Sequence, residues 1–311
     1  MRMDNNGLIL LDKNPGLTSF ESLNIIKKAL STGKVGHTGT LDKFASGLLV
    51  VLVGQALKLS SLLNFCDKEY EAQIRFGIET DTLDPEGKII REAEAPAKES
   101  VEEALLGFRG EIQQSPPAYS AIHINGKRAH ELSRQGKIPE MKKRPVTIKK
   151  LELISWEPPF ASIRVVCTSG TYIRSLARDI ALEAGSCAHL NALKRTRTGG
   201  FFLSNAFNPE ATNDSAILRQ LVMEAIQPIS PGIFSSCGLP FTHIEDKCIE
   251  PIRHGQSLYG HLLKDIIDNI DAGSVAGGMF PVMGLFDKNS ALIAMLKQKQ
   301  GKWQYANVFR S

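Results

Sequence analysis

The chain reads GHTGTLDKFASG from Gly36 to Gly47, and an apolar run from Leu48 to Val53 follows at once. The twelve residues from Gly36 to Gly47 include three glycines, three hydroxyl side chains, one histidine and one aspartate. This composition disfavours helix and strand, because glycine adopts conformations that other residues avoid and Asp, Ser and Thr compete for backbone hydrogen bonds. The sequence therefore predicts a structured loop that presents Asp42 and is anchored by a buried strand.

Considered alone, Asp42 has two interpretations. An aspartate in a glycine-rich loop commonly forms an Asx-turn. The functional alternative is a positioned carboxylate that acts as a nucleophile or a base. The Thr-Gly-Thr-Leu-Asp order is similar to the phosphorylated motif of ion-pumping ATPases, but there the aspartate precedes the threonines. No Walker pattern accompanies the segment either, which argues against a phosphate-binding loop.

The segments around this loop predict a mixture of strands and helices. Thr18 and Glu21 form a capping box for a helix that runs to about Leu30. The helix is expected to bury Phe20, Leu23, Ile26 and Leu30. Strands are predicted at Leu8–Leu11, Tyr70–Phe76, Val146–Trp156 and Phe160–Cys167, and further helices at Ser100–Phe108 and from Ile173 to Gly185. Because the order lacks a strict βαβ rhythm, we predict an α+β fold with a mainly antiparallel sheet flanked by helices.

The chain changes character after Ser230-Pro231-Gly232. Short apolar pieces separated by glycine or Asp-Lys turns predict a small all-β appendage over about 233–311. We therefore expect two domains, at residues 1–230 and 233–311, which 311 residues can accommodate.

Composition narrows the class of protein. No apolar run approaches the roughly 20 residues that span a bilayer, and the N-terminus lacks the apolar stretch of a signal peptide. The five cysteines are scattered without a CxxC pair, which suits a reducing cytoplasm. No HExxH, CxxC or GxGxxG motif is present, so neither a metal nor another cofactor is expected.

Positive charge is concentrated in one segment. The whole chain carries a net charge of +4, but residues 122–150 hold nine lysines and arginines against two glutamates, a net +7. Charge alone leaves two interpretations: a solvated loop with surface lysines, or an arm that contacts nucleic-acid phosphates.

Five further segments with distinctive sequences follow the Asp42 loop along the chain. They begin at Lys68-Glu69-Tyr70-Glu71-Ala72, Thr80-Asp81-Thr82-Leu83-Asp84, Gln114-Ser115-Pro116-Pro117-Ala118-Tyr119, Ser169-Gly170-Thr171-Tyr172-Ile173-Arg174 and Leu193-Lys194-Arg195-Thr196. Together with the Asp42 loop they closely resemble the TruB family of bacterial tRNA pseudouridine synthases, from about Gly7 to Phe202. The C-terminal third resembles a small PUA-like RNA-binding domain only weakly.

The resemblance implies the pseudouridine-synthase fold and isomerisation of one uridine in the T-arm loop of tRNA, at position 55. Asp42 matches the essential aspartate, Tyr70 the tyrosine that stacks on the target base, and Arg174 the arginine that pairs with the aspartate. The aspartate has three possible roles: it attacks C1′, adds to the base, or removes a ribose proton. Base flipping is required, since the reacting atoms of a stacked base are inaccessible.

The resemblance also implies how RNA is held. His37 matches the histidine that fills the space of the flipped base, Asp84 a carboxylate near the site, and Tyr172 and Leu193 the walls of the uracil pocket. Residues of about 114–144 match a mobile thumb over the T-arm. Its candidate phosphate contacts are Lys127, Arg128, Lys142, Lys143 and Arg144, and Lys194 with Arg195 forms a second basic cluster.

Two departures and two rival functions accompany this interpretation. Lys43 stands where the family usually has proline, which puts the stiffness of the loop in question, and His123 stands where lysine is common. The rivals are a non-catalytic RNA-binding protein with the same fold and a synthase acting on another uridine. The expected protein is a cytoplasmic monomer that binds tRNA and no membrane.

Overall fold

The computed structural model describes residues 6–120, 122–124, 126–135, 140–209, 212, 214–256 and 282–309. Its main element is a nine-stranded sheet in which all strand pairs are antiparallel except β3 with β12. The order is β1 (Gly7–Lys13), β3 (Ser46–Val53), β12 (Ala188–Thr198), β4 (Lys68–Phe76), β11 (Phe160–Cys167), β10 (Arg144–Glu157) and β7 (Gly110–Gln114). Two further strands, β2 (Val35–Thr38) and β13 (Phe201–Phe202), pair with β3 and β12.

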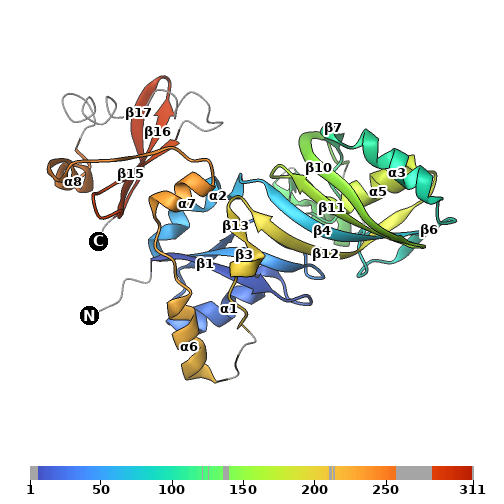
Figure 1. Cartoon of the computed structure of the whole chain (residues 1–311), viewed down its shortest axis with the longest axis horizontal. Coiled ribbons are helices and arrows are strands. Elements are labelled where there is room, and N and C mark those ends of the chain that lie inside the picture. Colours follow the sequence, from blue (N-terminus) through green and yellow to red (C-terminus); the bar gives the residue numbers. More distant parts are fainter. Residues whose placement is uncertain are drawn as a thin grey trace.

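Two groups of helices cover the two ends of this sheet (Figure 1). The helices α3 (Lys98–Gly107) and α5 (Ile173–Glu183) share one hydrophobic cluster with β4, β10, β11 and β12. At the other end, α1 (Ser19–Leu30) and α6 (Ser215–Glu224) pack on the apolar face of β1 and β3. The predicted α+β class with a mainly antiparallel sheet is thus confirmed, with one parallel strand pair in its middle.

Local patterns explain most of these elements. Alternating burial along β4 places Tyr70, Ala72, Ile74 and Phe76 inside, as the sequence alternation predicts. The capping box is present: the Thr18 side chain accepts from the backbone N–H of Glu21, whose carboxylate accepts from the backbone N–H of Thr18.

Three local predictions are wrong. The side chain of Phe20 is 64% exposed, because Ser19 takes the inward position and the next helical residue is turned by about 100°. Helix α3 starts at Lys98 after Ala97, which makes no side-chain cap, so Ser100 lies inside the helix instead of capping it. Gly36, His37 and Thr38 belong to strand β2, paired with β3, so the loop is shorter than its composition suggests.

The C-terminal region forms a second sheet. Its strands are β14 (Phe241–His243), β15 (Val282–Phe286), β16 (Leu292–Lys299) and β17 (Lys302–Val308), and β14 pairs with β15 in parallel. The region is mainly β but not all-β, because α7 (Pro231–Ser236) and α8 (Asp246–Arg253) accompany the sheet. An independent PUA-like domain over 233–311 stays a prediction.

The two sheets share a hydrophobic cluster. Phe234 of α7, Phe286 of β15 and Phe309 are buried with Leu48, Val50 and Leu52 of β3. Residues of 3₁₀ helix η1 (Gly54–Leu59) and helix α2 (Ser60–Asn64) complete this cluster. The rings of Phe234 and Phe286 meet edge to face, with their centroids 5.1 Å apart. The contact between the sheets is therefore a continuation of the core.

Smaller elements lie between the main strands: β5 (Ile78–Thr80) with β6 (Ile89–Glu92), β8 (His123–Ile124) with β9 (Lys127–Arg128), α4 (Ala129–Arg134), and the 3₁₀ helix η2 (Leu203–Asn205). In the predicted thumb, residues 121, 125 and 136–139 lie outside the described part of the chain. Within the described ranges, no helix has both the length and the apolar character needed to cross a membrane.

Candidate active site

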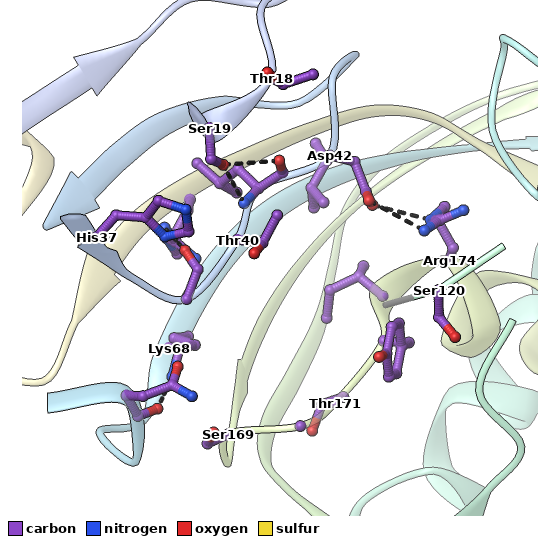
Figure 2. Close-up of a pocket in the computed structure, with 18 of the residues that line it drawn as sticks. Thr18, Ser19, His37, Thr40, Asp42, Lys68, Ser120, Ser169, Thr171 and Arg174 are labelled. Carbon is purple, nitrogen blue, oxygen red and sulfur yellow. Dashed lines mark hydrogen bonds and ion pairs between the residues drawn. The ribbon is translucent and has the colours of Figure 1, made fainter. Parts of the chain in front are cut away.

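A pocket of about 1450 Å³ opens where the Asp42 loop, β4, the start of α5 and β12 meet. Figure 2 shows Asp42 and Arg174 joined by dashed lines on one part of its wall, with His37, Lys68 and Ser120 on other parts. All seven residues that the sequence proposed for catalysis and substrate binding line this one pocket: His37, Asp42, Tyr70, Asp84, Tyr172, Arg174 and Leu193. The fold thus collects side chains that lie up to 156 positions apart in the chain.

Arg174 joins two carboxylates in the pocket. Its Nε lies 2.9 Å from Oδ2 of Asp42, and one Nη donates to Oδ1 of Asp42 at 3.1 Å. The other Nη donates to Oδ2 of Asp84 at 3.2 Å. Backbone carbonyls of Thr82 and Tyr119 accept at 2.7 and 3.1 Å. The predicted Arg174–Asp42 pair is present, and the planar guanidinium also fixes Asp84.

Exposure distinguishes the two carboxylates. The Asp84 side chain is 8% exposed and also accepts hydrogen bonds from the Thr82 hydroxyl and the Glu86 N–H. The Asp42 side chain is 36% exposed, whereas that of Arg174 is 6% exposed. Asp42 is therefore the carboxylate that a bound molecule can reach, and Asp84 is a buried support for its partner.

The position of Arg174 depends on how α5 begins. Tyr172 is the N-cap residue and makes no side-chain capping bond. Instead, the Gln114 side chain accepts from the Tyr172 N–H at 2.8 Å and donates to the Tyr172 carbonyl at 3.1 Å. Gln114 is 1% exposed at the end of β7. The sequence analysis assigned no role to Gln114; the available signal was its place at the start of the predicted thumb, two residues before Pro116-Pro117.

The Asp42 loop is held by buried groups on both sides. Ser19 donates to the Leu41 carbonyl at 3.0 Å and accepts from the Leu41 N–H at 2.8 Å (Figure 2). Lys13 is 1% exposed, and its ammonium donates to the Ala45 carbonyl at 2.5 Å. Arg195 donates to the carbonyls of Leu48 and Gly39.

Lys43, which stands where the family usually has proline, makes two contacts outside this loop. Its carbonyl accepts from the Gly16 N–H at 2.8 Å, and its exposed ammonium lies 3.9 Å from Glu86. A proline would fix φ at this position; here the backbone on both sides of Asp42 is bonded to the buried Ser19 and Lys13 instead.

Burial shapes the titration of the pocket. Burial raises the pKa of Asp42, and the Arg174 guanidinium opposes this shift. Burial also raises the pKa of Tyr70, so its phenol is neutral at physiological pH. Burial lowers the pKa of Lys13 and of Lys68 to about 8 in each case. Lys68, 6% exposed, donates to the Asn64 and Cys66 carbonyls and was given no role by the sequence.

The other predicted wall residues lie as follows. Tyr70 and Leu193 are each 7% exposed, from neighbouring strands β4 and β12. Tyr172 is half-buried, and burial raises the pKa of its phenol. His37 is half-buried on β2. Its Nδ1 makes no hydrogen bond to the described residues, and burial lowers the pKa of the imidazole.

The candidate phosphate contacts separate into two groups. Lys142, Lys143, Arg144 and Lys194 are exposed. Arg195 is 1% exposed because alternate residues of β12 face opposite sides, so Lys194-Arg195 is not one surface cluster as predicted. The backbones of Lys127 and Arg128 form β9, but their side chains lie outside the described part of the structure.

The described residues contain no group of three or more His, Cys, Asp or Glu side chains placed to hold a metal ion. The pocket holds a reachable carboxylate that is oriented by a buried guanidinium, and a neutral phenol lines the same pocket. Such an arrangement suits covalent or acid–base chemistry on a bound molecule.

Comparison with known proteins connects this site to a family. Residues 27–173 match the TruB family pseudouridylate synthase (N terminal domain). A tRNA pseudouridine synthase B of Borreliella burgdorferi (strain ZS7) is 49% identical over 227 residues, covering 72% of this chain and 80% of the relative. A tRNA pseudouridine synthase B of Clostridium kluyveri is 36% identical over 284 residues, covering 90% and 95%.

The fold has a solved counterpart. A chain in the crystal structure of a Cbf5-Nop10-Gar1 complex superposes with a TM-score of 0.71 at 27% identity. The superposition covers 98% of this chain and 84% of that chain. The likeness therefore extends over nearly the whole length of this chain.

Proposed function

This chain belongs to the TruB family of pseudouridylate synthases, and from that premise we propose that its substrate is the uridine at position 55, in the T-arm loop of tRNA. The protein is an enzyme that isomerises uridine to pseudouridine in tRNA, the activity named for its relatives. The main support for the proposed catalytic site is the Asp42–Arg174 ion pair, which lies in an open pocket.

Asp42 is the proposed catalytic residue. Isomerisation breaks the N1–C1′ bond, turns the base and forms a C5–C1′ bond, so the reacting atoms must leave the base stack. A flipped uridine in the pocket would meet the 36% exposed carboxylate of Asp42. Attack at C1′, addition to the base and removal of a ribose proton all need this carboxylate ionised, and the Arg174 guanidinium stabilises the ionised form.

The remaining wall residues are proposed to hold the base. Tyr70 stacks on the uracil and lies near the proton that leaves C5, since its neutral phenol faces the pocket from β4. Tyr172 and Leu193 close the sides of the base pocket, and His37 occupies the space from which the base has moved. Asp84 acts through Arg174, as a positioning residue.

The partner is proposed to be the T-arm stem-loop. The exposed cations Lys142, Lys143 and Arg144 lie at the end of the thumb segment, where β10 begins. Their proposed role is to contact phosphates, which position an RNA without reading its sequence. We propose that the protein acts as a cytoplasmic monomer; the cysteines, all free thiols in the described structure, suit a reducing compartment.

Tritium release tests this function. A T-arm stem-loop carrying 5-³H-uridine should lose its label when the wild-type protein is added, and the same stem-loop labelled at any other uridine should not. Asp42→Asn should lower the rate by roughly 10³-fold or more, because the carboxylate takes part in every step considered. Its affinity for the stem-loop should stay within a few-fold.

Each outcome discriminates between the rivals. Absence of release with wild-type protein that still binds the stem-loop would favour a non-catalytic RNA-binding protein. Release from another uridine would favour a synthase with a different target. Normal turnover by Asp42→Asn would remove Asp42 from the mechanism.

A further inference from the structure

An aromatic side chain stands uncovered at the edge of the pocket. Phe20 lines the pocket and is 64% exposed, the highest value among the large hydrophobic side chains of the described residues. Burying a phenylalanine side chain is favourable, so a molecule that enters the pocket and covers Phe20 would gain binding free energy from this contact. The family resemblance gave no role to this residue.

The position of Phe20 relative to Asp42 is fixed by the backbone. Its neighbour Ser19 makes two hydrogen bonds to Leu41, the residue before Asp42. The capping box of Thr18 and Glu21 holds the first turn of α1, in which Phe20 is the second residue. The ring is thus attached to a rigid element that is itself fastened to the loop carrying Asp42.

One side of the ring already carries a cation. The Lys27 ammonium lies 4.1 Å from the centroid of the Phe20 ring, a cation–π contact two helical turns along α1. The other side of the ring is free to receive a flat group, given its 64% exposure. An aromatic face with a neighbouring cation is the arrangement that proteins use for single-stranded bases, where the ring stacks and the cation meets the phosphate.

The surroundings favour a nucleobase over a protein surface. The two pocket residues that precede Phe20 in the sequence, Thr18 and Ser19, are polar. A protein-binding surface would need a contiguous apolar patch, and the next exposed apolar residue, Leu17, is absent from the pocket lining. A single aromatic ring in a polar rim matches a single base.

We propose that Phe20 stacks on a nucleobase of the substrate RNA that neighbours the uridine held in the pocket. This inference rests on the proposed function, because it places an RNA loop over the pocket. Phe20 would then be a binding residue outside the chemistry: it would hold the loop open beside the target while Asp42 acts.

Binding measurements test the proposal without turnover. In an Asp42→Asn background, Phe20→Ala should raise the Kd for the T-arm stem-loop roughly tenfold, as expected for loss of one base–aromatic stack. Phe20→Trp should keep the affinity, and its indole fluorescence should be quenched on RNA binding beyond any change seen without that substitution. Leu17→Ala, in an exposed apolar neighbour that does not line the pocket, should bind like the parent protein.

An abasic scan of the RNA identifies the base. Removing the stacked base should weaken binding to the parent protein about tenfold but should not weaken binding to the Phe20→Ala variant further. The proposal is overturned if Phe20→Ala binds like the parent, or if every abasic position weakens both proteins equally. Failure of all variants to bind the stem-loop would instead contradict the proposed function.

Discussion

The Asp42 loop and the thumb are both polar segments punctuated by glycine, yet they are built in opposite ways. The loop is fastened by side chains that are almost fully buried, such as Lys13, Ser19 and Arg195. The described cations at the end of the thumb, Lys142, Lys143 and Arg144, project into solvent.

The loop and the thumb thus use charged side chains in two different ways. A buried charge with several hydrogen bonds determines geometry, because any movement leaves a desolvated group unpaired. An exposed charge costs little to move and acts over a distance that salt screens. We therefore expect changes near the loop to alter the rate and changes in the thumb to alter the affinity and its salt dependence.

Among the changes that test this difference between the two regions, Arg174→Lys should have the largest effect, a loss of kcat. Lysine keeps the charge but cannot hold Asp42 and Asp84 together through one planar group. The kcat should fall by roughly 10²-fold, as expected for a displaced catalytic group. Arg174→Ala should in addition lower the free energy of unfolding by about 3 kcal/mol, because it leaves the buried Asp84 carboxylate unpaired.

Single-turnover kinetics and denaturant unfolding measure the two losses. Arg164→Lys is the matched control, since Arg164 forms an ion pair with Glu71 at 39% exposure and lies away from the pocket. A kcat for Arg174→Lys within a few-fold of wild type would show that charge alone suffices.

The sequence predicted the parts of this site that depend on local pattern. The capping box, the alternation of β4 and the helix carrying Arg174 each follow from a few neighbouring residues. The family resemblance then assigned Asp42, Tyr70 and Arg174 to one pocket. These regularities need no knowledge of tertiary contacts.

The supports of the site could not be predicted in this way. Gln114 and Tyr172 lie 58 positions apart, and Ser19 and Leu41 lie 22 apart, so nothing local links them. Phe20 fits the spacing of an apolar face, but the bonds of Ser19 to Leu41 set the helix rotation and leave Phe20 outside. Long-range hydrogen bonds decide both outcomes.

Removing thumb charge should give an intermediate effect. The triple variant Lys142→Gln, Lys143→Gln, Arg144→Gln should raise the KM about tenfold at physiological salt, since each phosphate contact contributes to counterion release. The slope of log Kd against log salt should fall by roughly 2, and kcat at saturating RNA should not change.

Lys98→Gln, an exposed cation on α3 away from the pocket, serves as the control for the triple variant and should leave the salt slope unchanged. The triple variant could instead lower kcat while the salt slope stayed at the wild-type value. The thumb cations would then affect the rate, as the buried side chains around the Asp42 loop are expected to do, and not the affinity.

Of the changes considered, lowering the pH slightly below neutrality should have the smallest effect on kcat. Because burial raises the pKa of Asp42, its ionised form is lost at a higher pH than that of an ordinary aspartate. The acid limb of kcat should therefore lie above the usual aspartate range, falling about tenfold per pH unit below the pKa. The same raised pKa makes Asp42 bind its proton more tightly when folded, so its contribution to stability rises on acidification and is lost as pH rises through that pKa.

Rates measured by single-turnover kinetics from pH 4 to 8 locate this acid limb. A limb at or below the pH range of an ordinary aspartate would contradict the effect of burial on the pKa of Asp42. The stability part is checked by unfolding Asp42→Asn over the same range. That variant should lose this acid-side contribution.

The hydrophobic cluster shared by the two sheets bears on how this chain can be divided. A chain ending near Ser230 would lose Phe234, Phe286 and Phe309 and would leave the apolar faces of β3 and α2 in water. Such a fragment is expected to aggregate, and its inactivity would say nothing about RNA recognition by the missing part. For the same reason, a C-terminal region taken from a relative is expected to replace this one only if its contact residues match those of β3 and α2.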